Sequence, residues 1–307
     1  MTMVDGTVEI AVLPGSLVPM SDEVARSFAR LSVQDVVAGA AYMVVAVVVV
    51  VELLWLRHTR HDPSRERDAA TAAGMAAGAV VVGVVYTAAF AGLWHVVGSR
   101  ASGGLVQLWQ DHPVLAFISA FVAWDASGFA YHLVGHRTRV GWAAHRPHHT
   151  GTEYNVALGL RQSWAPWHGL LIHPVLALGG WDLRTIAMCV AVSNLWQLLE
   201  HSAAPVRLPA WLRSVVMTPE SHRHHHLLDA GAVNLGPVFT IWDRLCGTWV
   251  PGPVGSEATY GVGGPVSANP LRVELQGWGE LLRRHQPWSA RPPVASLTPF
   301  RARSSAG

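Results

Sequence analysis

The chain has 307 residues, of which half are hydrophobic and 14% are charged, and its mean hydropathy is +0.27. Soluble domains carry about 25% charged residues, so this composition argues against a water-soluble enzyme. A formal net charge of +2, without blocks of like charge, also excludes an electrostatic binder of nucleic acid. Cys189 and Cys246 lie in apolar contexts without a CxxC spacing, which excludes a thiolate metal site and a disulfide framework.

Several apolar runs have the length of membrane helices, since a helix needs about 20 apolar residues to cross a hydrocarbon core of about 30 Å. Residues 36–56, 69–97 and 113–136 each form such a run. Residues 164–180 and 185–199 are shorter, and the Gly179-Gly180-Trp181-Asp182 sequence between them predicts a tight helical hairpin. The sequence therefore predicts an all-α integral membrane protein with a bundle of about four to five transmembrane helices.

The placement of arginine predicts the orientation of this bundle. All basic residues are Arg, and they concentrate in residues 57–68, 137–161 and 207–244. Residues 98–112 hold only Arg100, and the first 35 residues are net acidic. Because basic loops remain in the cytoplasm, the N-terminus is predicted outside and the C-terminal region inside a bacterial cytoplasmic membrane.

Changes in composition along the sequence divide the chain into three predicted regions. Residues 1–35 are predicted to be an extracytoplasmic segment without a cleaved signal peptide, because a basic stretch followed by a compact apolar one is missing. Residues 36–286 form the predicted membrane domain, with a motif-bearing core at 113–260. Residues 271–284 have the pattern of an amphipathic helix, and residues 287–307 are predicted to be a disordered tail.

The histidines are the most informative feature, because 12 of the 17 lie between His132 and His226. Residues three and four apart share a helix face, so HxxxH and HxxHH spacings aim several imidazoles in one direction. Neutral imidazole is a good ligand for iron, zinc or copper, and nine such groups suit two adjacent ions bound by four or five nitrogens each. All groups follow the predicted cytoplasmic ends of spans, which places the site at the membrane–cytoplasm boundary. The nine candidates are His132, His136, His145, His148, His149, His201, His222, His225 and His226.

The alternative to a metal site is that these spacings occur by chance, which is the usual explanation of a lone HxxxH pair. Four groups in order at one membrane depth favour a metal site. His224 is off the helical phase of its motif and is read as a flanking residue. His168 and His173 are read as buried polar partners within the hairpin.

Polar residues near the motifs are candidates for supporting contacts to the ligands. Asp125 lies two helical turns before His132 and is placed to accept the distal N–H of that imidazole. A helix-packing contact is the alternative for Asp125. Weaker candidates for the same role are Glu153, Asn155, Asn194, Glu200 and Asn234.

Three segments resemble the fatty acid hydroxylase/sterol desaturase superfamily of membrane oxidoreductases. Residues 120–136, AFVAWDASGFAYHLVGH, look like its Asp-then-HxxxH helix. Residues 141–163, GWAAHRPHHTGTEYNVALGLRQS, and residues 218–251, TPESHRHHHLLDAGAVNLGPVFTIWDRLCGTWVP, look like its second and third motifs. The LRQS segment and the Gln197-x-x-x-His201 pair are most similar to the sterol desaturase and alkylglycerol monooxygenase branch.

This resemblance implies membrane helices under a cytoplasmic helical cap, with a two-iron site that uses dioxygen as co-substrate. It carries the ligand role to the nine histidines above, with no catalytic residue beyond the metal centre. Zinc is expected to replace iron in some purified preparations. Gln197 stands where related acyl hydroxylases have a histidine, which implies a weak or water-mediated ligand. Departures from the pattern are Leu133 for Arg, Ser221 for His and Cys246 for Phe.

The implied function is dioxygen-dependent hydroxylation or desaturation of a lipid that enters from the bilayer. Sterol, fatty acyl, carotenoid and ether lipids all remain open as substrates. A separate electron donor, such as a reductase, ferredoxin or cytochrome, is expected as a partner. A zinc hydrolase is disfavoured because no HExxH motif supplies a general base. A non-catalytic metal-binding protein or transporter remains the alternative, although a transporter would hold ligands at mid-membrane.

Overall fold

The computed structural model describes residues 2–4, 7–9, 63–165, 167–204, 208–228, 230–252, 254 and 258–283, together with short pieces between 47 and 58. Within these ranges the chain is mostly helical, as predicted. The expected first span at 36–56 lies largely outside the described residues. The same is true of most of the N-terminal segment 1–35 and of the whole tail 287–307.

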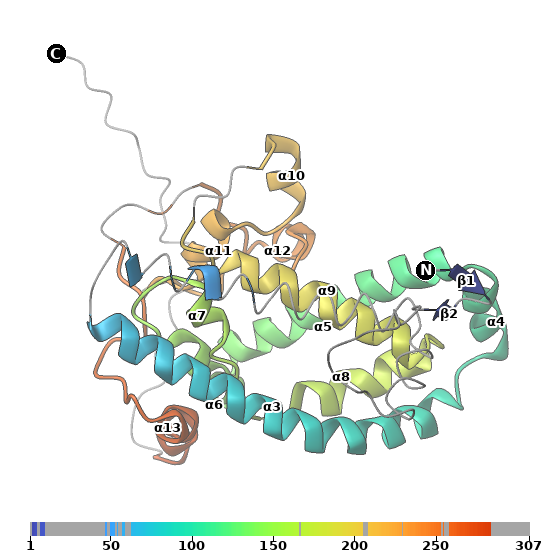
Figure 1. Ribbon diagram of the computed structural model, residues 1–307, viewed down its shortest axis with the longest axis horizontal. Coiled ribbons are helices and arrows are strands. Elements are labelled where there is room, and N and C mark those ends of the chain that lie inside the picture. Colours follow the sequence, from blue (N-terminus) through green and yellow to red (C-terminus); the bar gives the residue numbers. More distant parts are fainter. Residues whose placement is uncertain are drawn as a thin grey trace, which may run out of the picture.

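Four helices run lengthwise through the molecule and form its bundle (Figure 1). They are α3 Pro63–Gly98, α5 Pro113–Arg137, α8 Trp167–Leu178 and α9 Leu183–Glu200. Among the described residues, two stretches are long and apolar enough to cross a membrane, Glu66–Tyr86 in α3 and the whole of α5. Pro113 occupies the first turn of α5, where its missing N–H costs no helical hydrogen bond.

The predicted helical hairpin is present as α8 and α9. Gly180 has a φ of 78°, which glycine adopts without strain, and Asp182 caps α9 by accepting from the Thr185 amide at 2.9 Å. With 12 and 18 residues, the two helices are about 18 and 27 Å long. The first arm is therefore too short to cross a core of about 30 Å.

The turn of the hairpin contacts α4 Gly103–Asp111, a helix that was not predicted from the sequence. The Trp109 indole N–H donates to the Gly179 carbonyl at 2.8 Å, and its ring stacks on Trp181 with centroids 5.7 Å apart. Both indoles thus pair their polar atom while they cover the turn. At the chain start, a short hairpin, also not predicted, pairs β1 Thr2–Val4 antiparallel with β2 Thr7–Glu9, Thr2 opposite Glu9.

Outward-facing side chains of the bundle are apolar. Val80, Val81, Val84 and Val85 on α3 are 65–72% exposed, and Ile118 on α5 is 54% exposed. The inward side forms a core of Trp94, Ala120, Trp124, Leu176, Ala177, Ile186 and Cys189. A continuous exposed valine surface is unfavourable in water and typical of contact with lipid.

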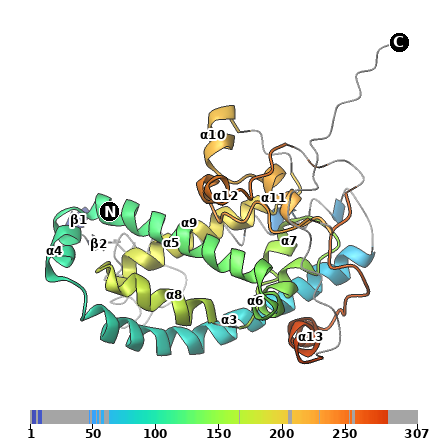
Figure 2. The same ribbon diagram turned by 180° about the vertical axis from the view of Figure 1, so that it is seen from behind.

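Short helices gather at one end of the bundle (Figures 1 and 2). They are α6 Arg139–His145, the 3-10 helix η1 Arg146–His149, α7 Val156–Gly159, α10 Ala210–Val215, α11 Pro219–His225, α12 Ile241–Cys246 and α13 Pro270–Leu282. The last agrees with the amphipathic helix predicted at 271–284. Most of these helices have a side-chain cap at the N-terminus, such as Thr218 on α11 and Asn269 on α13.

Helix α13 crosses α6 at Gly277, and this contact makes a testable prediction. A Cβ atom at Gly277 would lie 2.4 Å from the Ala143 carbonyl oxygen, a backbone atom that cannot rotate away. Gly277→Ala is therefore expected to lower the free energy of unfolding by about 1–3 kcal/mol, measured by thermal melts in detergent. Gly279→Ala on the same helix meets only the Arg283 side chain, at 3.5 Å, and is expected to be neutral or slightly stabilising. Equal effects of the two substitutions would contradict this packing.

Candidate metal centre

The nine predicted histidines lie together in two groups at the short-helix end of the bundle. His132, His136, His145, His149 and His225 form the five-His cluster. His148, His201, His222 and His226 form the four-His cluster. Within each cluster, every side chain offers a ring nitrogen within 4.8 Å of the others.

Each HxxHH motif divides between the two clusters. On α11, His222 and His226 are four residues apart and share a face, which directs both into the four-His cluster, while His225 joins the five-His cluster. In the HxxHH motif at 145–149 the assignment is reversed. His145 and His149 belong to the five-His cluster, and His148 belongs to the four-His cluster. The two motifs therefore interlock, and each contributes to both clusters.

Distances between ring nitrogens match those of ligands around a common ion. In the four-His cluster, His201 Nε2 lies 3.3, 3.1 and 3.2 Å from the Nε2 atoms of His148, His226 and His222. Two nitrogens bound to one ion at about 2.0–2.1 Å are about 2.9–3.4 Å apart for octahedral to tetrahedral angles. The four-His cluster is thus already the size of a coordination sphere.

Backbone carbonyls determine which ring nitrogen carries the proton. His132 Nδ1 lies 2.8 Å from the Leu235 oxygen, and His225 Nδ1 lies 3.0 Å from the Val233 oxygen. A carbonyl only accepts, so each Nδ1 donates and each Nε2 presents a lone pair. These two Nε2 atoms are 3.0 Å apart, with no proton to share between neutral rings. A cation between them removes this repulsion, so the residues present fit a metal centre.

Burial keeps the clustered imidazoles neutral. It lowers the pKa of His148, His149, His222, His225 and His226 well below 6.5, and neighbouring imidazoles lower each pKa further. Burial also lowers the pKa of His201 to about 4, although its Nδ1 donates to the Gln197 carbonyl at 2.6 Å, which favours the protonated ring. Near pH 7 the rings are therefore neutral and compete little with protons for a metal.

Comparison with known proteins relates this site to a family. Residues 117–248 match the model of the fatty acid hydroxylase family, and all nine histidines fall within that range. The match covers less than half of the chain, and over this range the chain is similar to that family. The resemblance read from the sequence motifs is thereby confirmed.

Several curated proteins are also similar to this chain. Alkylglycerol monooxygenase from Homo sapiens is 28% identical over 185 residues, which cover 55% of this chain and 40% of the relative. The Xenopus tropicalis enzyme of that name is 27% identical over 56% of this chain and 38% of the relative. An ornithine lipid hydroxylase from Rhizobium tropici is 27% identical over 52% of this chain and 50% of the relative. The chain thus spans about half the length of these relatives or less. No solved structure gives a significant match.

Asp125 does not accept a hydrogen bond from the His132 imidazole, the contact that the sequence suggested. Its Oδ2 accepts from the Trp242 indole at 2.7 Å and the Phe239 amide at 3.1 Å, while the His132 proton goes to Leu235. The helical phase was right, but the chain after α11 folds back and places a backbone carbonyl nearer to the imidazole. Asp125 fastens that returning segment to α5.

Asp243 is a supporting residue that the sequence analysis missed. Its Oδ1 accepts from the Leu235 amide at 2.8 Å and its Oδ2 from the Gly236 amide at 2.7 Å. Its side chain is fully buried and holds the loop whose carbonyl orients His132. A signal for it stands in the sequence, because Asp243 belongs to the WDRLCGT stretch at 242–248, within the third segment that resembles the family.

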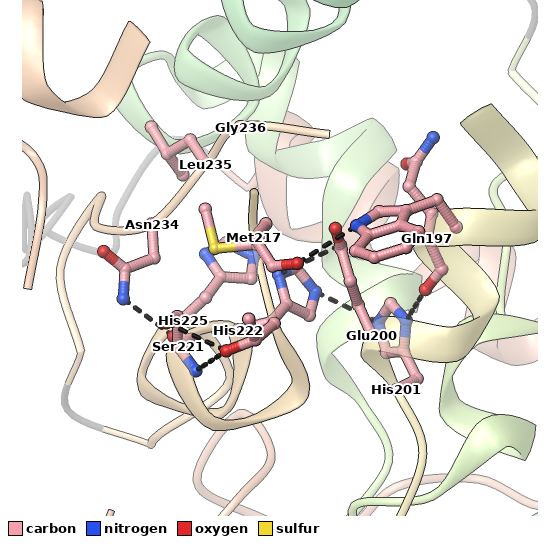
Figure 3. A network of polar contacts seen from close by, with 12 residues as sticks. Gln197, Glu200, His201, Met217, Ser221, His222, His225, Asn234, Leu235 and Gly236 are labelled. Carbon is pink, nitrogen blue, oxygen red and sulfur yellow. Dashed lines mark hydrogen bonds and ion pairs between the residues drawn. The ribbon is translucent and has the colours of Figure 1, made fainter. Parts of the chain in front are cut away.

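Asn234 occupies the centre of the same loop (Figure 3). Its backbone has a φ of 50°, in the left-handed region, and its side chain makes three hydrogen bonds. Nδ2 donates to the Ser221 and Val250 carbonyls at 2.7 and 2.9 Å, and Oδ1 accepts from the Val250 amide at 2.8 Å. The carbonyls on either side of it are those that orient two ligands of the five-His cluster, one from α5 and one from α11.

Asn234→Ala is expected to weaken metal binding about 10- to 100-fold, the usual effect of losing a contact that orients a ligand. Alanine removes the three side-chain hydrogen bonds and disfavours the positive φ. Competition with a chelator measures the affinity. Asn155→Ala is the control, since Asn155 caps α7 through the Ala157 amide at 2.9 Å. That change should cost about 1 kcal/mol of stability and retain the metal, and equal metal loss in both variants would contradict the role of Asn234.

The remaining predicted residues have other positions. The Gln197 amide donates to Ser193 Oγ at 3.0 Å and points away from the cluster, so its backbone carbonyl rather than its side chain serves His201 (Figure 3). Glu153 is half-buried in the loop before α7. His224 is bonded to the Gly252 carbonyl at 2.7 Å, outside both clusters, as predicted. His173 packs in the bundle against Phe90, with ring centroids 4.8 Å apart.

Proposed function

We propose that this protein is a membrane-bound, dioxygen-dependent lipid hydroxylase with two iron ions held by the nine histidines. The observation that carries the proposal is the division of these residues into a five-His and a four-His cluster with converging nitrogens. The names of the relatives, alkylglycerol monooxygenase and ornithine lipid hydroxylase, describe oxidation of lipids and favour this reaction class. Sterol, fatty acyl and carotenoid lipids remain alternative substrates.

The donor set and the family together favour a redox metal over a hydrolytic one. All nine candidate ligands are neutral nitrogens, a set that suits iron, copper or zinc in general. A family of oxygenating enzymes favours iron among these, because zinc has no redox chemistry. When bound, the iron pair supplies dioxygen activation, and one hydroxylation consumes one dioxygen, two electrons and two protons to give an alcohol and water.

The protein's own residues position and shield this centre. The carbonyls of Val233, Leu235 and Gln197 hold three imidazoles with Nε2 lone pairs directed inward. Tyr154 covers the four-His cluster, stacked on His201 with centroids 5.9 Å apart, and donates its hydroxyl proton to a backbone carbonyl at 2.6 Å. Burial of these groups excludes water, which protects the C–H oxidation from side reactions.

The membrane arrangement follows from the apolar helices. We place α3 and α5 across the bilayer, the α8–α9 hairpin partly within it, and a further span at 36–56, which gives four to five membrane segments. The Arg-rich segments then place the short helices and the metal centre on the cytoplasmic side of a bacterial inner membrane. We accordingly assign residues 1–35 to the outside, 36–286 to the membrane domain, and 287–307 to the cytoplasmic side.

Two partners complete the proposed reaction. A lipid reaches the centre from the bilayer, since α5, the helix that carries His132 and His136, also has exposed apolar side chains such as Ile118. A separate electron-donor protein, a reductase, ferredoxin or cytochrome, delivers the two electrons at the cytoplasmic face.

Labelled dioxygen tests the reaction. Purified protein in vesicles, supplied with a ferredoxin and its reductase, is incubated under ¹⁸O₂ with an alkylglycerol, an ornithine lipid, a sterol or a phospholipid. Appearance of ¹⁸O in the product lipid is expected and identifies a hydroxylase. Loss of two hydrogens without ¹⁸O identifies a desaturase. Metal binding without oxygen uptake for any lipid would indicate instead a transporter, sensor or hydrolase.

A further inference from the structure

Glu200, the last residue of α9, is a buried carboxyl group that lies beside the four-His cluster. Only 1% of it is exposed, and neither carboxylate oxygen makes a hydrogen bond of good geometry among the described residues, because the nearby Trp196 indole donates to the Met217 carbonyl at 3.0 Å. Burial of a carboxyl without a partner is costly, so a role that compensates this cost is expected. The neighbouring residue, His201, belongs to the cluster itself.

The carboxyl group faces an imidazole that also lacks a hydrogen bond on that side. Glu200 Oε2 lies 3.8 Å from His222 Nδ1, and this Nδ1 is a buried nitrogen without another partner among the described residues. The opposite nitrogen of the ring, Nε2, lies 3.2 Å from His201 Nε2 and 3.1 Å from His226 Nε2. Figure 3 shows the carboxyl directed toward the His222 ring from the neighbouring helix. His222 therefore has one ring nitrogen, Nδ1, next to the carboxyl group and the other, Nε2, in the centre of the four-His cluster.

The charge of the carboxyl group explains why this arrangement would be useful to a metal site. Nine neutral imidazoles bring no negative charge to two divalent ions, and a buried site in a low dielectric needs compensation. In the five-His cluster, two ligands are oriented by neutral carbonyls, those of Leu235 and Val233. The four-His cluster has one such carbonyl, that of Gln197, together with this carboxyl group. The two halves of the centre thus have different surroundings.

We infer that Glu200 is a positioning residue for the metal in the four-His cluster, which accepts from His222 Nδ1 and supplies negative charge to that half of the centre. The inference rests on the proposed metal pair. It makes the two ions inequivalent, because only the ion in the four-His cluster depends on a carboxylate.

Glu200→Gln separates charge from shape, since the amide keeps the size of the side chain. Iron content, release of iron to a chelator and thermal unfolding are compared in detergent for loaded and metal-free protein. We expect one of the two irons to dissociate about 10- to 100-fold faster than in the parent protein, with the other unchanged. Metal-free variant protein should melt at the same or a higher temperature, because an unpaired buried carboxyl is removed, and the loaded variant at a lower one. A purely structural role would lower both.

Glu220→Gln is the matched control. Glu220 lies on α11, two residues before His222, but its side chain is 46% exposed and pairs with Arg213 at the surface, 3.7 Å away. This variant should keep both irons with unchanged release. Two tightly held irons in Glu200→Gln, or metal-free protein that melts lower, would overturn the inference while leaving the proposed function intact. A parent protein without two irons would overturn the proposed function itself.

Discussion

Replacing His225 with alanine is expected to eliminate product formation, with a fall of at least about 100-fold, because even outer contacts of metal ligands are worth about 10- to 100-fold. His225 Nε2 lies 3.0 Å from His132 Nε2 at the centre of the five-His cluster, and its Nδ1 is held by the Val233 carbonyl. Without it, the five-His cluster loses the imidazole that links α11 to α5. Product formation and iron content, measured on the same sample, should fall together.

His224→Ala is the control for this variant, because it removes a histidine from the same motif without touching a cluster. His224 is half-buried and lies outside both clusters, and its Nε2 pairs with the Gly252 carbonyl at 2.7 Å. Activity and iron content should stay within about twofold of the parent protein, as for most surface substitutions. Similar losses in both variants would show that the motif acts through helix α11 as a whole rather than through the imidazole of His225.

Arg161→Leu is expected to have the largest effect on stability, a loss of about 3–5 kcal/mol, because it leaves one partner of a buried ion pair alone. The Arg161 side chain is 1% exposed and lies 2.5 Å from Asp68 Oδ1. It also donates to Thr150 Oγ1 at 2.8 Å, directly after the second histidine motif. Chemical unfolding in detergent measures the loss, and iron content reports whether the motif is displaced.

A matched surface pair shows whether burial is the cause. Arg213 and Glu220 are half exposed and 3.7 Å apart, so Arg213→Ala should cost less than about 1 kcal/mol. Removing both buried charges with Asp68→Leu and Arg161→Leu should cost less than Arg161→Leu alone, since no charge is left unpaired. A double variant less stable than the single one would contradict the assigned ion pair.

The sequence was sufficient to identify all nine histidines that cluster, because spacing on helices is a local property. The same is true of the α8–α9 hairpin, where two glycines and the cap of Asp182 mark the turn. The division of each HxxHH motif between clusters was not foreseen. It depends on how α11 and η1 face each other, which is a tertiary relation between residues far apart in the chain.

Supporting contacts were predicted least well, for a physical reason. The orienting groups of His132, His225 and His201 are backbone carbonyls, which every residue has and which no residue type marks. For Asp125, helical phase suggested a contact to His132, with a helix-packing contact as the alternative, and the returning loop after α11 occupies the place beside that imidazole. The pair of Arg161 and Asp68 joins residues 93 positions apart, beyond any local pattern.

The metal content of the purified protein, combined with anaerobic reduction and re-exposure to air, tests the central claim most directly. The account predicts two irons per chain, a change in the iron spectrum on reduction, and dioxygen uptake that depends on lipid. His225→Ala should lose iron, and His224→Ala should not. A single zinc per chain with no redox response would contradict a two-iron hydroxylase.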